Sequence, residues 1–262
     1  MRIASIASGS GGNCIYVGSD RYHVLIDAGI SLRRIETGLK QLGLTGADID
    51  AVLITHEHSD HVSGLGPLLK KYHMPLYASA GTIRELSRMP ALSSFGEEDY
   101  RYAAAGNRFA VGDLTILPIR ISHDAAEPLM YRLFNGSVSA AVVTDVGVVT
   151  RELTEKLRDL DALFLEANHD IRMLETGPYP YFLKRRIAGD RGHLCNENAA
   201  ALISELSCPR LKTVVLSHIS KTNNYSDLAL ESVRVELKAR ELKDIPRLLT
   251  APEAAISEII EI

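Results

Sequence analysis

Short apolar runs alternate with polar and glycine-rich segments along the first part of the chain. Runs of this length predict β-strands over 2–8, 13–19, 22–27 and 50–55. Between the third and fourth runs, apolar residues recur at spacings of three and four, which predicts an amphipathic helix; these are Leu32, Ile35, Leu39 and Leu42. Further periodic segments predict helices over 65–72 and 82–89.

The rest of the chain continues this mixture of strands and helices. We expect strands over 114–121, 131–134, 137–144, 162–165, 211–216 and 245–249, with a hairpin turn at Asn135-Gly136. Helices are predicted over 151–157, 196–206 and 227–243. Two β-rich blocks with accompanying helices predict an α+β fold, in which two mixed sheets pack face to face between outer helices. No Ser-, Gly- or Pro-rich linker divides the sequence, so we expect one domain over residues 1–262.

Charge and cysteine content narrow the classes of function. A formal net charge of -4 over 262 residues gives no globally basic surface, so phosphate binding would need a local patch or metal ions. Neither a secretory signal nor the roughly 20-residue apolar run of a membrane span is present, which predicts a cytoplasmic protein without membrane contact. The three cysteines form no C-x-x-C pair, so we expect reduced thiols rather than disulfides or a thiolate zinc site.

Candidate metal ligands are concentrated in His56-Glu57-His58-Ser59-Asp60-His61, directly after the apolar strand that ends at Thr55. In an extended segment His56 and His58 point the same way, whereas the adjacent Asp60 and His61 diverge. One segment therefore presents ligands in two directions, which suits two neighbouring metal ions. Imidazole and carboxylate groups accept zinc, manganese or iron.

Other apolar strands end in residues of the same chemical type. Asp27, His123, Asp145 and His218 each follow such a strand. Strand ends gathered at one edge of a sheet are a common place for a functional site. Taken singly, each of these residues fits a turn at the end of a strand. Taken with the histidine cluster, they predict one site.

Together these motifs resemble the metallo-β-lactamase superfamily. The cluster matches its H-x-H-x-D-H motif, and the strand-end residues from Asp27 to His218 follow in the order of its other motifs. The resemblance implies a four-layer αββα metallo-β-lactamase sandwich that binds two divalent metal ions, Zn²⁺ or Mn²⁺, with iron as a further option. It implies that His56, His58 and His123 hold one ion and that Asp60, His61 and His218 hold the other. Asp145 would bridge the two ions, and Asp27 would orient the ligands through hydrogen bonds.

Several activities within the superfamily fit these residues. β-Lactamases are secreted and typically carry Cys or Ser where this chain has Asp145, so antibiotic hydrolysis is not expected. A thioesterase similar to glyoxalase II and a small-metabolite phosphodiesterase stay open. Asp60 and Asp145 speak against a non-catalytic metal-dependent sensor. The segments around Glu166 and His193 resemble loops of tRNase Z-type enzymes, which implies that His193 is a general acid oriented by Glu166. A surface residue at a helix start explains His193 equally well.

The glycine loop over 8–14, together with Glu166-Ala167-Asn168-His169-Asp170 and Gly192-His193-Leu194, looks most like the small bacterial YycJ/WalJ-type exonucleases. This resemblance implies a 5′-to-3′ exonuclease on DNA, in which a hydroxide shared by two metal ions attacks phosphorus and Asp60 orients it. The loop lacks the Gly-Lys-Ser/Thr ending of a Walker loop, so we expect a tight turn that approaches the site. A loop hydrogen bond explains His169 as well as a catalytic role does.

A basic segment near these residues supplies candidate contacts to substrate phosphates, namely Lys184, Arg185, Arg186 and Arg191. A solvated helix face is the more common explanation of such a run. Tyr179, Tyr181 and Phe182 could stack on nucleic-acid bases, although such residues more often fill a core. These residues would suit a nucleic acid without setting DNA against RNA, and the resemblance to the YycJ/WalJ-type exonucleases implies that the partner is DNA.

Overall fold

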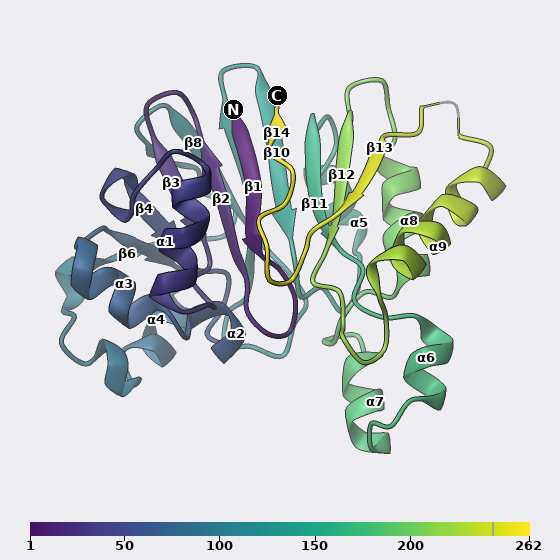
Figure 1. The fold of residues 1–262 in the computed structure, drawn as a ribbon, viewed down its shortest axis with the longest axis horizontal. Coiled ribbons are helices and arrows are strands. Elements are labelled where there is room, and N and C mark those ends of the chain that lie inside the picture. Colours follow the sequence, from purple (N-terminus) through teal and green to yellow (C-terminus); the bar gives the residue numbers. More distant parts are fainter. Residues whose placement is uncertain (243) are drawn as a thin grey trace.

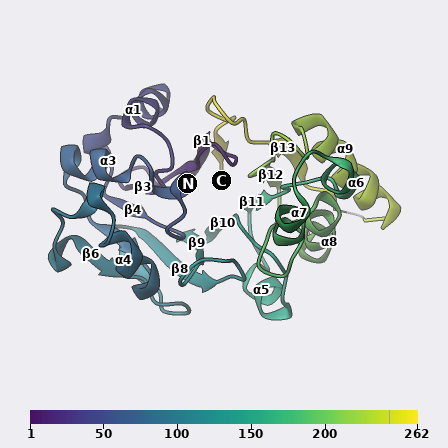
Figure 2. The same ribbon diagram turned by 90° about the horizontal axis from the view of Figure 1, so that it is seen from below.

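A computed structural model describes residues 1–242 and 244–262. Two seven-stranded sheets pack face to face, and helices cover the outer face of each (Figures 1 and 2). The first sheet carries α1 (Leu32–Gln41), α3 (Leu65–Tyr72) and α4 (Ala80–Leu86); the second carries α5 (Arg151–Lys156), α8 (Asn196–Leu206) and α9 (Ser226–Ala239). The expected α+β fold with four αββα layers is confirmed.

The first sheet is mixed, with its parallel half next to the histidine cluster. Its order is β14 (Ile260–Glu261), β1 (Arg2–Ala7), β2 (Cys14–Gly18), β3 (His23–Ile26), β4 (Ala51–Leu53), β5 (Leu76–Ala78) and β6 (Tyr100–Tyr102). Pairing is antiparallel from β14 to β3 and parallel from β3 to β6. Because β14 pairs with β1, the two chain termini lie side by side (Figure 1).

The second sheet has the same mixed character. Its order is β13 (Arg247–Thr250), β12 (Thr213–Ser217), β11 (Ala162–Glu166), β10 (Val138–Val143), β9 (Leu129–Asn135), β8 (Leu114–Arg120) and β7 (Phe109–Val111). Strands β10 to β13 are parallel, whereas β7 to β10 pair antiparallel. The β9–β10 hairpin is confirmed, but its turn lies one residue later than predicted: Asn135 pairs with Val138, so the turn residues are Gly136 and Ser137.

Both faces of the central strands are buried, which explains why these strands are apolar at nearly every position. In β11, Phe164 packs in the core between the two sheets, while Leu163 and Leu165 pack against the outer helices. In β3, Val24 and Ile26 face the other sheet and Leu25 faces outward. Alternation along each strand therefore builds three apolar layers, one between the sheets and one under each set of helices.

Several short elements were not predicted from the sequence. They are α2 (Ser59–Val62), β5, β6, β14, α6 (Ile171–Thr176), α7 (Tyr181–Ile187) and the 3₁₀ turns Gly46–Asp48, Pro90–Leu92 and Glu97–Asp99. The shortest strands and turns give too few positions for a period to be visible, and α7 has no buried residue to mark a helical face. The helix predicted over 227–243 is α9, which ends at Ala239; residue 243 lies outside the described residues.

None of the helices in the described ranges combines the length and the apolar character that crossing a bilayer requires. Three free cysteines are present, with Cys14 and Cys195 buried and Cys208 half-buried.

The core between the sheets makes a measurable contribution to stability. Phe164 is fully buried there, so Phe164→Ala removes a large side chain and leaves a cavity. We expect the free energy of unfolding to fall by about 3–5 kcal/mol in urea titrations. Val235→Ala, at an exposed position of α9, is the control and should shift it by about 0.5 kcal/mol or less. Equal shifts for the two variants would contradict the assignment of Phe164 to the core.

Candidate metal centre

Parallel strands from both sheets deliver polar residues to one edge of the sandwich. Asp27 follows β3, and the histidine cluster follows β4; in the second sheet Asp145 follows β10 and His218 follows β12. Because the carboxyl ends of parallel strands meet at one edge, these residues converge although they are far apart in sequence. The structure brings all the predicted ligands into four overlapping groups of possible metal donors: His56, His58 and His123; Asp60, His61 and His218; His56, His61 and Asp145; and Asp145, Glu166, His193 and His218.

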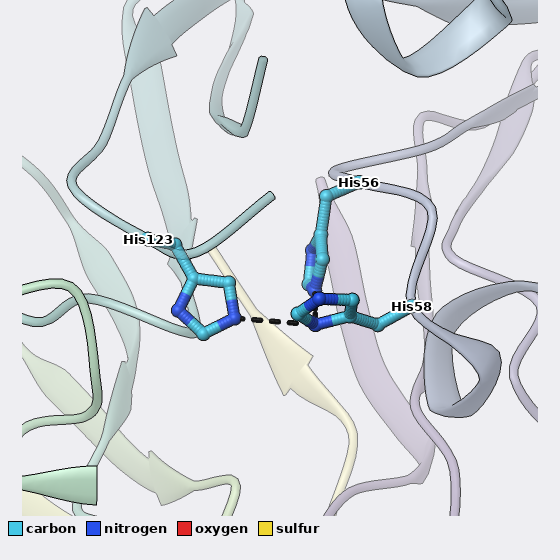
Figure 3. Close-up of side chains that lie close together, drawn as sticks. All are labelled: His56, His58 and His123. Carbon is cyan, nitrogen blue, oxygen red and sulfur yellow. Dashed lines mark hydrogen bonds between the residues drawn. The ribbon is translucent and has the colours of Figure 1, made fainter. Parts of the chain in front are cut away.

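His56, His58 and His123 form the first group (Figure 3). Nε2 of His56 lies 3.0 Å from Nδ1 of His58, and Nε2 of His123 lies 3.3 Å from the same atom. The carbonyl of Gly192 lies 3.1 Å from Nδ1 of His123, so this ring can donate there and keep Nε2 free. Burial lowers the pKa of both His56 and His123. Burial thus favours the neutral form of both rings, which is the form that binds a metal.

Asp60, His61 and His218 form a second group. Oδ2 of Asp60 lies 3.4 Å from Nε2 of His61 and 3.5 Å from Nε2 of His218. Burial opposes a charge on His218, but the carboxylates of Asp145, Asp60 and Glu166 outweigh it and raise the pKa of His218 to about 10. This shift shows that negative charge is in excess around the ring.

Asp145 lies between the two groups. Its Oδ2 is 3.2 Å from Nε2 of His61, and its Oδ1 is 3.7 Å from Nε2 of His123 and 3.6 Å from Nε2 of His218. One carboxylate thus faces ligands of both groups, which is the placement that a bridging ligand requires.

Three residues of the site have a left-handed backbone. The φ angles of Asp27, Asp145 and His218 are 62°, 58° and 52°. Asp and His adopt this region more readily than most residues, yet each instance costs on the order of 1 kcal/mol. The conformation ends each strand abruptly and leaves the side chain at the sheet edge. Backbone strain concentrated at one place in this way is typical of functional sites.

Asp27 connects β3 to the histidine cluster. Its carboxylate accepts hydrogen bonds from the backbone nitrogen of Thr55 at 2.8 Å and from Oγ1 of Thr55 at 2.9 Å. Its Oδ2 also lies 2.8 Å from Nδ1 of His61. A proton on Nδ1 would be donated to this carboxylate and would leave Nε2 of His61 free for a metal.

Glu166 links His193 to the same site. Oε1 of this buried carboxylate lies 2.7 Å from Nδ1 of His193 and 3.0 Å from Nδ1 of His218. Its Oε2 accepts hydrogen bonds from the backbone nitrogens of Val146 and Leu194. Burial opposes the charge on Glu166, but His193 and His218 lower its pKa to about 2. In return, Glu166 and Asp145 raise the pKa of His193 against the effect of its burial.

The residues present fit divalent metal ions. Asp27, Asp145 and Glu166 are buried close together, and a buried carboxylate needs a compensating positive charge. Oδ2 of Asp145 and Nε2 of His218 are buried and have no hydrogen-bond partner among the residues that the structure describes, although both lie among other possible metal donors. Nitrogen and oxygen donors in this proportion suit zinc, manganese or iron.

The candidate ligands open into a pocket of about 210 Å³, which α7 and its preceding loop help to line. His58, Asp60, Asp145, His193 and His218 form its floor, and Tyr179, Leu183, Arg186 and Ile187 form one wall. A larger cavity of about 740 Å³ lies between α5 and α8, but none of the candidate ligands lines it. Because the titratable groups converge at the smaller pocket, we place the site there.

The four basic residues have different environments. Nζ of Lys184 donates to the carbonyl of Glu175. Nε and Nη2 of Arg191 both donate to the carbonyl of His123, so Arg191 helps to hold a candidate ligand in place. Arg185 is exposed, and Arg186 alone of the four lines the pocket, where its Nε donates to Oδ2 of Asp124.

The aromatic residues of this region do not fill a core. Tyr181 and Phe182 are 75% and 73% exposed, so that explanation was wrong for both, and Tyr179 lines the pocket. His169 is buried, with its Nδ1 lacking a hydrogen-bond partner among the described residues, so the loop hydrogen bond considered for it is not seen at this atom. The backbone of His169 pairs with that of Cys195.

Sequence reasoning missed three residues that contact the site. The glycine loop does make a tight turn, and Nδ2 of Asn13 lies 3.2 Å from Nε2 of His61. Oδ1 of Asp124 lies 3.4 Å from Nε2 of His123, and Nδ2 of Asn168 donates to the carbonyl of His218. Asn13 and Asn168 lie within segments singled out in the sequence and Asp124 follows His123, but no spacing rule sets them apart from ordinary loop residues.

An αββα sandwich with imidazole and carboxylate donors converging at one edge defines the class of metal-dependent hydrolases with the metallo-β-lactamase fold. The family model described as a beta-lactamase superfamily domain matches residues 22–219, and the chain belongs to this superfamily.

Two relatives place the chain more narrowly. It is 37% identical over 240 residues to exodeoxyribonuclease YycJ of Bacillus anthracis, covering 92% of this chain and 90% of that protein. It is 37% identical over 229 residues to exodeoxyribonuclease WalJ of Streptococcus pneumoniae serotype 2, covering 87% and 85%. Among solved structures, the Zn²⁺-bound PqqB of Methylobacterium extorquens superposes with a TM-score of 0.75 at 18% identity over the whole of both chains. The resemblance to YycJ/WalJ-type proteins is thus confirmed.

The contacts of Asp27 lead to a prediction about metal affinity. Asp27→Ala removes the acceptor of Thr55 and of His61, so the His61 ring loses its fixed tautomer. We expect metal affinity to fall by about 10- to 100-fold in chelator-competition titrations, with the fold retained by circular dichroism. The exposed Asp20 supplies a matched control, Asp20→Ala, which should bind metal like the wild type. Unchanged affinity in Asp27→Ala would remove the orienting role from this residue.

Proposed function

We propose that this protein is a two-metal-dependent exonuclease that degrades DNA in the 5′-to-3′ direction in the cytoplasm. One observation carries the proposal: two donor groups with Asp145 between them open into the same pocket as His193, whose Nδ1 contacts the buried Glu166. The relatives named exodeoxyribonucleases support DNA as the substrate. The polarity rests on the resemblance of the motifs, and the three free thiols support a reducing compartment.

The two donor groups define which residues would hold the metal ions. His56, His58 and His123 would hold one ion, and Asp60, His61 and His218 the other, with Asp145 shared between them. Zn²⁺ and Mn²⁺ suit this set best, and iron is also compatible with it. When bound, such a pair of ions supplies Lewis-acid charge and a nucleophile at neutral pH.

His193 and Glu166 act together in the proposed reaction. Glu166 accepts a hydrogen bond from Nδ1 of His193, which orients the ring and stabilises its protonated form. Nε2 of His193 then donates a proton to the oxygen that leaves phosphorus, which assists a poor leaving group. Asp60 lines the same pocket and orients the attacking water as a hydrogen-bond acceptor.

The substrate range of the wild-type enzyme tests the activity. Protein reconstituted with Mn²⁺ or Zn²⁺ is incubated with 5′- and 3′-labelled single- and double-stranded DNA, with RNA and with a generic thioester. We expect progressive shortening of DNA from its 5′ end, and no cleavage after chelation. Cleavage of the thioester alone would replace the nuclease by a thioesterase, and shortening from the 3′ end would reverse the polarity.

His193 provides the sharpest mutational test of the mechanism. His193 belongs to the four-residue donor group but to neither of the two groups proposed to hold an ion. His193→Ala therefore removes the proton donor, and metal content should stay at the wild-type level. We expect single-turnover cleavage to slow by about 10²- to 10⁴-fold. The control is His73→Asn, at an exposed position where φ is 50° and Asn is well tolerated. A wild-type rate for His193→Ala would show that another group protonates the leaving oxygen.

A further inference from the structure

Helices α6 and α7 extend beyond the sandwich at the edge that carries the donor groups (Figure 1). None of the seven residues of α7 is buried. Leu183, Arg186 and Ile187 form part of the pocket wall, together with Tyr179 just before the helix. One side of α7 therefore lines the site, and its remaining surface is open to solvent.

Phe182 and Arg186 lie four residues apart, so they are neighbours on the surface of α7. Arg186 lines the pocket, which places Phe182 beside the pocket mouth with its ring 73% exposed. Tyr181 and Arg185 form a parallel row turned about 100° around the helix. The two rows have the same chemistry, but only the first includes a pocket residue.

Arg186 is held in place by Asp124. Its Nε donates to Oδ2 of Asp124, while Oδ1 of Asp124 lies 3.4 Å from Nε2 of His123. A guanidinium has five N–H donors in a fixed plane, so the terminal nitrogens stay available for a phosphate. Because Asp124 contacts both Arg186 and His123, it would set the position of that phosphate relative to the first donor group.

We infer that the Phe182–Arg186 row binds single-stranded DNA next to the phosphodiester that is cleaved. The ring of Phe182 stacks on an unpaired base, and Arg186 binds a phosphate of the same strand. The inference rests on the proposed nuclease function. Stacking requires a base with a free face, which an unpaired strand offers and a duplex covers. Lys184, Arg185 and Arg186 give α7 three positive charges, and none of its residues is acidic, so its charge complements a phosphate backbone.

Binding of a phosphorothioate oligonucleotide tests the inference without requiring cleavage. Fluorescence anisotropy of the metal-loaded protein with a labelled strand should show about 5- to 150-fold weaker binding for Phe182→Ala. Arg186→Ala should also weaken binding. The slope of log affinity against log salt concentration should become shallower by about 1, as expected for the loss of one phosphate contact. In kinetics on phosphodiester DNA, the loss should appear in KM more than in kcat. Both substitutions should also reduce the cleavage of DNA more than the cleavage of bis(p-nitrophenyl) phosphate, a small phosphodiester without nucleic-acid bases.

Two comparisons make the assignment specific. Tyr102→Ala removes an aromatic ring that is 69% exposed on β6 and should bind the strand like the wild type. An equal loss of affinity in Tyr181→Ala and Phe182→Ala would contradict the assignment of the Phe182–Arg186 row as the binding surface. Equal affinity of the wild type for a blunt duplex and for the single strand would also contradict it. A wild type that binds the strand but cleaves no DNA would refute the nuclease and leave the subsite standing. Cleavage unaffected by Phe182→Ala would refute the subsite alone.

Discussion

The parallel pairing of strands in both sheets is the constraint on which the site depends. Pairing of β3 with β4, and of β10 with β11 and β12, brings their carboxyl ends to one edge of the sandwich. At that edge the chain turns sharply, through left-handed backbone at Asp27, Asp145 and His218. The strands are rigid because both of their faces are buried, so they can hold these turns against their conformational cost. The geometry of the metal donors therefore depends on the packing of the core between the two sheets.

Charge explains how the residues of this edge divide their roles. Asp27 and Glu166 are buried, and hydrogen bonds from Thr55 to Asp27 and from two backbone nitrogens to Glu166 hold these carboxylates in place. Each carboxylate also contacts imidazole nitrogens and can therefore orient those rings. Asp145 is also buried, but within the described part of the chain its Oδ2 has no hydrogen-bond partner and faces the two donor groups. The raised pKa of His218 and the lowered pKa of Glu166 both express the mutual attraction of these groups. An excess of carboxylate in so small a volume calls for cations.

In the proposed function, the protruding helices separate the contact with DNA from the donor groups. The sandwich supplies the ligands from strand ends, whereas α7 contributes only to the pocket wall and has no part in the core. Arg186 connects the two parts through Asp124, and Arg191 connects them through the carbonyl of His123. An element that makes so few apolar contacts can vary in sequence at little cost to the stability of the fold. Such an arrangement allows one scaffold to serve several substrates.

The layered fold follows from local patterns in the sequence, because two β-rich blocks with buried faces can cover themselves only with each other and with helices. The sequence also determined which residues were candidates for the site, since the histidine cluster and the polar strand ends are visible as local patterns. The different environments of Arg186 and Arg191, the exposure of the aromatic residues, and the contacts of Asn13 and Asp124 with the site became visible only in the folded chain. These outcomes depend on contacts between residues distant in sequence, such as Arg186 with Asp124 and Asn13 with His61. No local periodicity records such contacts.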